Sequence, residues 1–169
     1  MRKRVLILDT SVLCCWLQVP GKETAGPSSD QWNHTRIDVL LKAEGEKRAL
    51  FVLPLATLIE TGNHIAQASS NRFALACSLA DYLRRAANEN SPWAAFTAQS
   101  ELWGVDNLRL LADSWPKLAS CGITLGDATI KDVADYYSKA GYDVKIVTGD
   151  QALKAHEPAK PVAIPRRRK

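Results

Sequence analysis

A short, uninterrupted apolar run at residues 5–8 restricts the fold of this chain more than any other feature. Such a run is typical of a strand that is buried on both faces, as in the middle of a parallel sheet. Comparable runs recur at residues 49–53 and 144–148, and segments with helical spacing of apolar residues separate the three. Strands that alternate with helices favour an α/β fold, with helices on both faces of a central parallel sheet.

The segments between these strands carry helix signals. Helices are expected over four stretches of the chain, namely residues 10–17, 71–87, 96–121 and 127–140. The third of these is expected to break near Gly104 and again near Pro116. A further helix, which begins near residue 30, is expected to be capped by Ser29 or Asp30.

The helix that follows the second strand is expected to begin at Pro54, because proline is tolerated in the first turn of a helix. Its buried stripe is expected to contain Leu55, Leu58, Ile59, Gly62 and Ala66. Residues 18–29 are rich in Gly, Pro and Ser and are expected to form a loop. Loops of this length inside a compact domain tend to be functional or mobile. Residues 161–164 are expected to form a short edge strand.

The length of 169 residues suits one domain, residues 1–169, with a core over about residues 4–155 and a basic C-terminal tail. The net charge is +4, and much of the positive charge lies at the two ends of the chain. This charge fits a polyanionic partner, and it fits solvated termini equally well.

No apolar run approaches the roughly 20 residues that cross a bilayer. Asp9 ends the N-terminal apolar run well short of the roughly 7–15 residues that a signal peptide needs. A cytoplasmic protein without a membrane partner is therefore expected. The four cysteines lack the spacing of a zinc site, so they are expected to be reduced and packed as small hydrophobic side chains.

Four acidic residues stand where they can meet at one edge of the expected sheet. Asp9 directly follows the first strand, and Asp150 follows the third. Glu60 lies in the second turn of the helix entered from the second strand, and Asp127 lies in the first turn of its own helix. Carboxylate oxygens suit Mg²⁺ or Mn²⁺, and a cation offsets the repulsion between them. Such ions promote the hydrolysis of phosphodiester bonds, so the pattern indicates a metal-dependent nuclease.

Each acid also has a simpler structural interpretation. Asp9 and Asp127 can cap the helices that follow them, and Asp150 can belong to a turn. Helical phase places Asp127 at the head of an apolar stripe, where a metal site would explain an acid. The same reasoning places Glu60 opposite its expected buried stripe, on a face that is either exposed or lines an open cleft.

Four segments of the sequence, in this order, resemble the PIN-domain nucleases. They are ILDTSVL, LPLATLIETGNHI, TLGDATIKDVADYY and VKIVTGD, and together they span roughly residues 4–155. The resemblance implies a three-layer fold with a central parallel sheet. It also implies RNA cleavage by Mg²⁺ or Mn²⁺ bound to clustered acids, with Asp9, Glu60, Asp127 and Asp150 at the matching positions. The long segment 18–29 and the Trp-rich stretch 93–115 depart from the smaller members of the family.

The resemblance implies further residues and partners. Ser11 and Thr148 match hydroxyl positions that steady the acids. Because many bacterial members are toxins of toxin–antitoxin pairs, an inhibitory antitoxin protein is expected, and a homodimer fits the family as well. Basic residues are expected to hold the RNA backbone, namely Lys131, Lys154, Arg166, Arg167 and Arg168.

Two alternatives remain open at this point. The chain can be a catalytically inactive PIN-like subunit that acts as a binding module or scaffold in a larger nucleic-acid complex. Trp93, Trp103 and Trp115 can stack on RNA bases, although packing in the core or in an interface is the simpler expectation.

Overall fold

The computed structural model describes residues 2–94 and 96–160, and its main sheet has three parallel strands in the order β4-β1-β5. These strands are β1 (Arg4–Leu8), β4 (Leu50–Val52) and β5 (Asp143–Val147). In the register of the sheet, Ile7 of β1 lies opposite Val52 on one side and Ile146 on the other. The sequence prediction of an α/β fold with a parallel sheet is confirmed, and the run at residues 5–8 forms the central strand.

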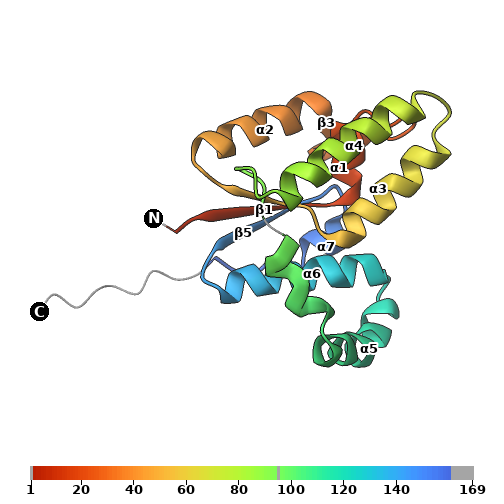
Figure 1. The fold of residues 1–169 in the computed structure, drawn as a ribbon. Helices are drawn as coiled ribbons and strands as arrows, with labels where there is room; N and C mark the ends of the chain where they lie inside the picture. Colours follow the sequence, from red (N-terminus) through yellow and green to blue (C-terminus); the bar gives the residue numbers. More distant parts are fainter. Residues whose placement is uncertain (1, 95, 161–169) are drawn as a thin grey trace, which may run out of the picture.

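Alternate residues of β1 point into two separate apolar layers. Leu6 and Leu8 pack in one layer with α1 (Thr10–Trp16) and α2 (His34–Glu46). Val5 and Ile7 pack in the other layer, mainly against α6 (Leu125–Lys139). Figure 1 shows α2 and α4 on one side of the strands and α6 with α5 on the other, so helices cover both faces of the sheet.

The remaining helices connect and extend these layers. They are α3 (Leu55–Gln67), α4 (Arg72–Ala87), the 3₁₀ segment η2 (Phe96–Trp103), α5 (Val105–Ala119) and the short α7 (Gln151–Lys154). The expected break at Gly104 is present, because this residue is the N-cap of α5. The expected break at Pro116 was wrong. Helix α5 has no buried residue, so water can bond the carbonyl oxygen that lacks an amide partner at this proline.

The segment expected to be a loop at residues 18–29 contains more structure than the sequence indicated. A small antiparallel hairpin joins β2 (Thr24–Ala25) to β3 (Trp32–Asn33), with the 3₁₀ turn η1 (Ser28–Asp30) between them. The N-cap of α2 is Asn33, which accepts a hydrogen bond from the backbone N–H of Arg36. The expected caps, Ser29 and Asp30, belong to η1 instead, because the hairpin delays the start of the helix.

The buried face of α3 also differs from the sequence prediction. Leu55 and Ile59 are exposed, at 40% and 56%, whereas Thr57 and Thr61 are fully buried. Thr57 can be buried because its hydroxyl donates to the carbonyl oxygen of Leu8, at 2.9 Å. The buried face of α3 is therefore rotated by about a quarter-turn from the apolar stripe that the sequence predicted. The expected edge strand at residues 161–164 lies outside the described residues.

Both edges of the sheet are covered. At the β4 edge, Phe51 exchanges backbone hydrogen bonds with the chain at Pro92 and Ala94. At the β5 edge, the backbone N–H of Ile146 donates to Glu157, and Lys154 donates to the carbonyl oxygen of Ile146. Covered edges do not offer a template for unwanted strand pairing.

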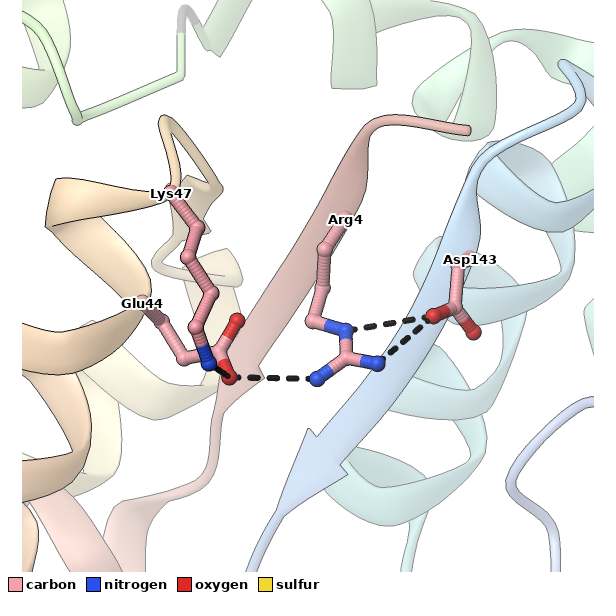
Figure 2. A network of polar contacts seen from close by, with 4 residues as sticks. All are labelled: Arg4, Glu44, Lys47 and Asp143. Carbon is pink, nitrogen blue, oxygen red and sulfur yellow. Dashed lines mark hydrogen bonds and ion pairs between the residues drawn. The ribbon is translucent and has the colours of Figure 1, made fainter. Parts of the chain in front are cut away.

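An ionic network fixes the end of the sheet at which β1 and β5 begin (Figure 2). Arg4 donates two hydrogen bonds to Asp143 and one to Glu44, which is buried at the end of α2. Lys47 reaches the same oxygen of Glu44 at 3.2 Å. Arg4 therefore ties α2 to the edge strand, at the opposite end of the sheet from the residues that follow the strands.

The tryptophans and cysteines divide between core and surface. Trp93 is buried against Trp16, Phe51 and Tyr82, whereas Trp103 is 38% exposed. Trp115 is half-buried and donates to the carbonyl oxygen of Ile123. All four cysteines are free. Cys14 and Cys15 are buried, as predicted for small hydrophobic side chains. Cys77 and Cys121 are exposed, so the prediction was wrong for these two. Among the described residues, no helix is both long and apolar enough to cross a membrane.

Candidate active site

An open hollow of about 500 Å³ lies beyond the carboxyl ends of β1 and β5. All four acids singled out in the sequence line it: Asp9, Glu60, Asp127 and Asp150. They come from four separate parts of the chain: Asp9 and Asp150 follow two strands, Glu60 lies in the second turn of α3, and Asp127 lies in the first turn of α6. Parallel strands that end at one edge of a sheet bring their following residues together in this way. We call this space the acidic hollow.

Asp9 is the most firmly held of the four acids and is only 5% exposed. It is the N-cap of α1, and its Oδ2 accepts hydrogen bonds from the hydroxyls of Ser11 and Thr148, both at 2.7 Å. Burial raises the pKa of the Asp9 carboxyl, the two hydroxyls act in the opposite direction, and the nearby charge of Asp127 raises it further.

Ser11 and Thr148 link the two strand ends through their hydroxyls. Ser11 Oγ donates to Asp9 and accepts from the backbone N–H of Gly149, at 3.0 Å. Thr148 Oγ1 donates to Asp9 and accepts from the backbone N–H of Asp150, at 2.9 Å. Each hydroxyl therefore joins the acid after β1 to the turn after β5, so the spacing between these two acids does not depend on the exposed side chains around them.

Glu60 is half-buried, and its carboxylate lies between the first turns of α1 and α6. Its Oε2 accepts a hydrogen bond from Thr10 Oγ1 at 2.8 Å. Its Oε1 lies so close to Gly126 that a Cβ atom at that position would overlap it. The sequence reasoning placed Glu60 opposite the buried stripe. Because the true stripe is centred on Leu58, Thr61 and Ile65, Glu60 lies at its border and reaches the hollow.

Asp127 takes part in a capping box at the start of α6, and the N-cap of that helix is Thr124. Asp127 Oδ2 accepts from the Thr124 backbone N–H and hydroxyl, and the hydroxyl in turn accepts from the Asp127 backbone N–H. The helix therefore begins two residues before the position expected from the sequence. The motif Thr-x-x-Asp at residues 124–127 could have revealed this, since it is a capping-box signature.

Asp150 is exposed and is the N-cap of α7. Its Oδ1 accepts from the backbone N–H groups of Ala152 and Leu153, at 2.7 and 3.3 Å. The four acids thus share one arrangement. In each, a carboxylate oxygen accepts hydrogen bonds that hold the local structure.

The donor chemistry of the acidic hollow suits a hard divalent cation such as Mg²⁺ or Mn²⁺. Within the described part of the chain, however, no three Asp, Glu, His or Cys side chains stand close enough together to hold a metal ion as they are placed. Asp9 is fixed, whereas Glu60 and Asp127 are half-buried and Asp150 is exposed. Metal binding at this site would require these three side chains to rotate toward Asp9.

Three further residues in the lining were not expected from the sequence as site residues. Lys22, from the turn before β2, and His64, one turn after Glu60 on α3, bring basic groups to the acidic hollow. Cys14 also lines it, but burial raises the pKa of its thiol to about 11, against the lowering effect of the Lys22 charge. The thiol is therefore protonated at neutral pH and is no ready nucleophile.

The hairpin made by β2 and β3 closes one side of the acidic hollow. Trp32 Nε1 donates to the carbonyl oxygen of Thr148 at 3.0 Å, and both residues are buried. A Cβ atom on Gly149 would lie 2.5 Å from the backbone nitrogen of Gly26, so the hairpin backbone packs directly on the turn after β5. Only glycine permits this approach.

The basic residues expected to hold RNA do not line the acidic hollow where the structure describes them. Lys131 pairs with Asp135 at 2.7 Å on α6. Lys154 donates a hydrogen bond to the carbonyl oxygen of Ile146 and forms an ion pair with Glu157 at the β5 edge. Arg166, Arg167 and Arg168 lie outside the described residues.

Comparison with known proteins gave no match to this chain, whether among family models, curated sequences or solved structures.

Proposed function

We propose that this protein is a metal-dependent endoribonuclease that hydrolyses RNA phosphodiester bonds at the acidic hollow. One observation carries the proposal: four carboxylates that are far apart in the sequence line one open hollow at the carboxyl edge of a parallel sheet. The most buried of these acids, Asp9, is held by two hydroxyls, and burial of a carboxylate costs stability, which favours a functional role.

The four acids have different roles in this proposal. Asp9, Asp127 and Asp150 would hold Mg²⁺ or Mn²⁺, and the ion would supply water activation and charge stabilisation at the leaving oxygen. Glu60, fixed by Thr10, is a further ligand or the base that orients the attacking water. Ser11 and Thr148 keep Asp9 in place. In-line attack by water leaves a 5′-phosphate and a 3′-hydroxyl.

The proposal is tested by incubating purified protein with end-labelled RNA in Mn²⁺, Mg²⁺ or EDTA. Cleavage is expected with either metal and not with EDTA. Asp9→Asn and Asp150→Asn should each abolish cleavage and keep the fold, because asparagine oxygen can still accept the capping hydrogen bonds.

Asp135→Asn is the matched control for the acidic variants. This residue lies on the same helix as Asp127 but pairs with Lys131 outside the hollow, so cleavage should be unchanged. Full activity in Asp9→Asn or Asp150→Asn would refute the assignment of these residues.

The PIN-like sequence pattern leads us to propose a wider role as well. A toxin or defence ribonuclease needs control, so an inhibitory antitoxin protein and a homodimer are the partners to seek. Co-purification from cells that express the neighbouring reading frames, followed by the cleavage assay with and without the captured protein, tests this role.

A second function is favoured by a specific observation. Asp9 and Asp150 are helix N-caps, Asp127 belongs to a capping box, and no ready metal-binding group is formed among the described residues. The acids would then be structural, and the chain would be an inactive binding or scaffold subunit. Absence of cleavage with every metal, together with retained RNA binding, would favour this alternative.

A further inference from the structure

A second hollow of about 460 Å³ adjoins the acidic hollow. Its lining comes from the turn before β2 and from the end of α3: Val19, Pro20, Gly21, Lys22, His64, Gln67, Ala68 and Ser69. Lys22 and His64 line both spaces, so these two side chains form the boundary between them. We call this space the neutral hollow, because its other lining residues carry no charge.

The backbone of Lys22 is held in place from several directions. The turn at residues 19–22 closes with a hydrogen bond from Lys22 N–H to the Val19 carbonyl oxygen, and Pro20 and Gly21, with φ of 81°, suit a type II turn. The next residue, Glu23, accepts a bond from the thiol of Cys15 through its carbonyl oxygen. The hairpin that follows is packed on Gly149.

Lys22 lines the acidic hollow together with four carboxylates, but within the described structure its ammonium group is not at ion-pair distance from any of them. No ion pair joins it to any residue among 2–94 and 96–160, although four other lysines in that range, Lys42, Lys47, Lys131 and Lys154, are paired with carboxylates. It is also the one lysine or arginine among the described residues that line the acidic hollow.

This position matters because an acidic hollow repels a polyanion. A metal ion can compensate for the charge at the bond that is cut, but the next phosphate along the strand lies beyond that ion. It needs a cation of its own at the exit of the hollow. Lys22 supplies a full positive charge there, and the His64 ring supplies an N–H donor beside it.

We propose that Lys22 and His64 bind the RNA phosphate adjacent to the one that is cut, and that the strand continues from the acidic hollow into the neutral hollow. This inference rests on the proposed function. Lys22 and His64 are positioning residues: they hold the strand and do not touch the reacting atoms. The neutral hollow receives the flanking nucleotide, so the protein distinguishes an RNA strand from a dinucleotide.

The test compares Lys22→Gln with Lys22→Arg, using a single-stranded RNA of about ten nucleotides and a dinucleotide that has only the phosphate to be cut. With the longer RNA, Lys22→Gln should raise KM about threefold to tenfold with little change in kcat, and Lys22→Arg should restore it. With the dinucleotide, Lys22→Gln should have the same KM and kcat as the wild-type protein. His64→Ala should show the same dependence on length.

A binding measurement separates this inference from the proposed function. Fluorescence anisotropy with the longer RNA is carried out in the Asp9→Asn background, so that the RNA stays intact. Adding Lys22→Gln should reduce the slope of log affinity against log salt by about 0.7, the value for one phosphate contact on a single strand. Lys42→Gln is the matched control, because Lys42 lies on α2, pairs with Asp38 and lines neither hollow.

The outcomes are distinct. Binding and KM that are unchanged in Lys22→Gln would overturn the inference, and so would an equal loss with the dinucleotide, which would place Lys22 at the scissile phosphate. The wild-type protein could fail to cleave RNA while Lys22→Gln still reduces the slope of log affinity against log salt. That result would refute the proposed function and support the phosphate site.

Discussion

Replacing Gly126 with alanine should weaken RNA cleavage without weakening the fold. Gly126 lies in the first turn of α6, where the absence of a side chain leaves room for the Glu60 carboxylate. An alanine Cβ would lie closer to Glu60 Oε1 than the 3.0 Å limit that real Cβ atoms observe, and 3.3 Å from the carboxyl carbon. Because Glu60 is the flexible partner, it is the carboxylate that moves.

The size of the effect follows from this geometry. Glu60 Oε1 has to retreat by about 1 Å to reach ordinary van der Waals contact, and this disturbs its bond from Thr10. The lost hydrogen bond costs about 0.5–1.5 kcal/mol, and alanine in a helix returns up to about 1 kcal/mol. The free energy of unfolding should therefore change by less than about 1 kcal/mol. A displacement of about 1 Å in an active site lowers the rate by up to about 10²-fold.

Gly62→Ala is the matched control for this variant. Gly62 is also a helical glycine, two residues from Glu60, but a Cβ atom there meets nothing within 4 Å. It should stabilise the protein by up to about 1 kcal/mol and leave the cleavage rate unchanged. Both variants are compared by urea unfolding and by initial rates with labelled RNA. A fully active Gly126→Ala protein would refute the role given to the Glu60 carboxylate.

Two further predictions concern stability. Burial raises the pKa of the Asp9 carboxyl above its ordinary 3.8, so the folded protein binds this proton more tightly than the unfolded chain. The free energy of unfolding should fall as the pH rises from 3.8 towards the raised value, and Asp9→Asn should remove that fall in denaturant titrations at several pH values. Arg4→Met should destabilise the protein by about 1–3 kcal/mol because Glu44 and Asp143 lose their shared donor, with cleavage unchanged. Lys47→Met, which removes only a more exposed partner of Glu44, should cost less than about 1 kcal/mol by the same assay.

The acids after the strands were predictable because their placement depends on chain direction alone. An apolar run followed at once by Asp9 gives a buried strand with an acid at its carboxyl end, and Asp150 follows β5 after a short turn of two residues. Once the strands are parallel, both acids reach the same edge of the sheet. The sequence pattern alone therefore predicted that these two residues would lie close together.

The orientation of α3 could not be predicted from its own residues. The helix carries apolar side chains on more than one face, and two of its fully buried residues are threonines. Its rotation depends on contacts with α1 and α4, and on the hydroxyl bond from Thr57 to Leu8. For this reason helical phase alone did not decide whether Glu60 is a surface residue or lines a cleft, whereas packing brings it to the edge of the acidic hollow.

The amino-acid sequence by itself determined the three strands, their parallel arrangement with helices between them, and the acids that follow β1 and β5. Those features depend on local patterns of apolar residues and on chain direction. Only the tertiary structure decided which face of α3 is buried, how the β2–β3 hairpin closes the hollow, and where Lys22 and His64 stand. These features depend on contacts between segments far apart in the chain, such as Trp32 with Thr148, which no local pattern records.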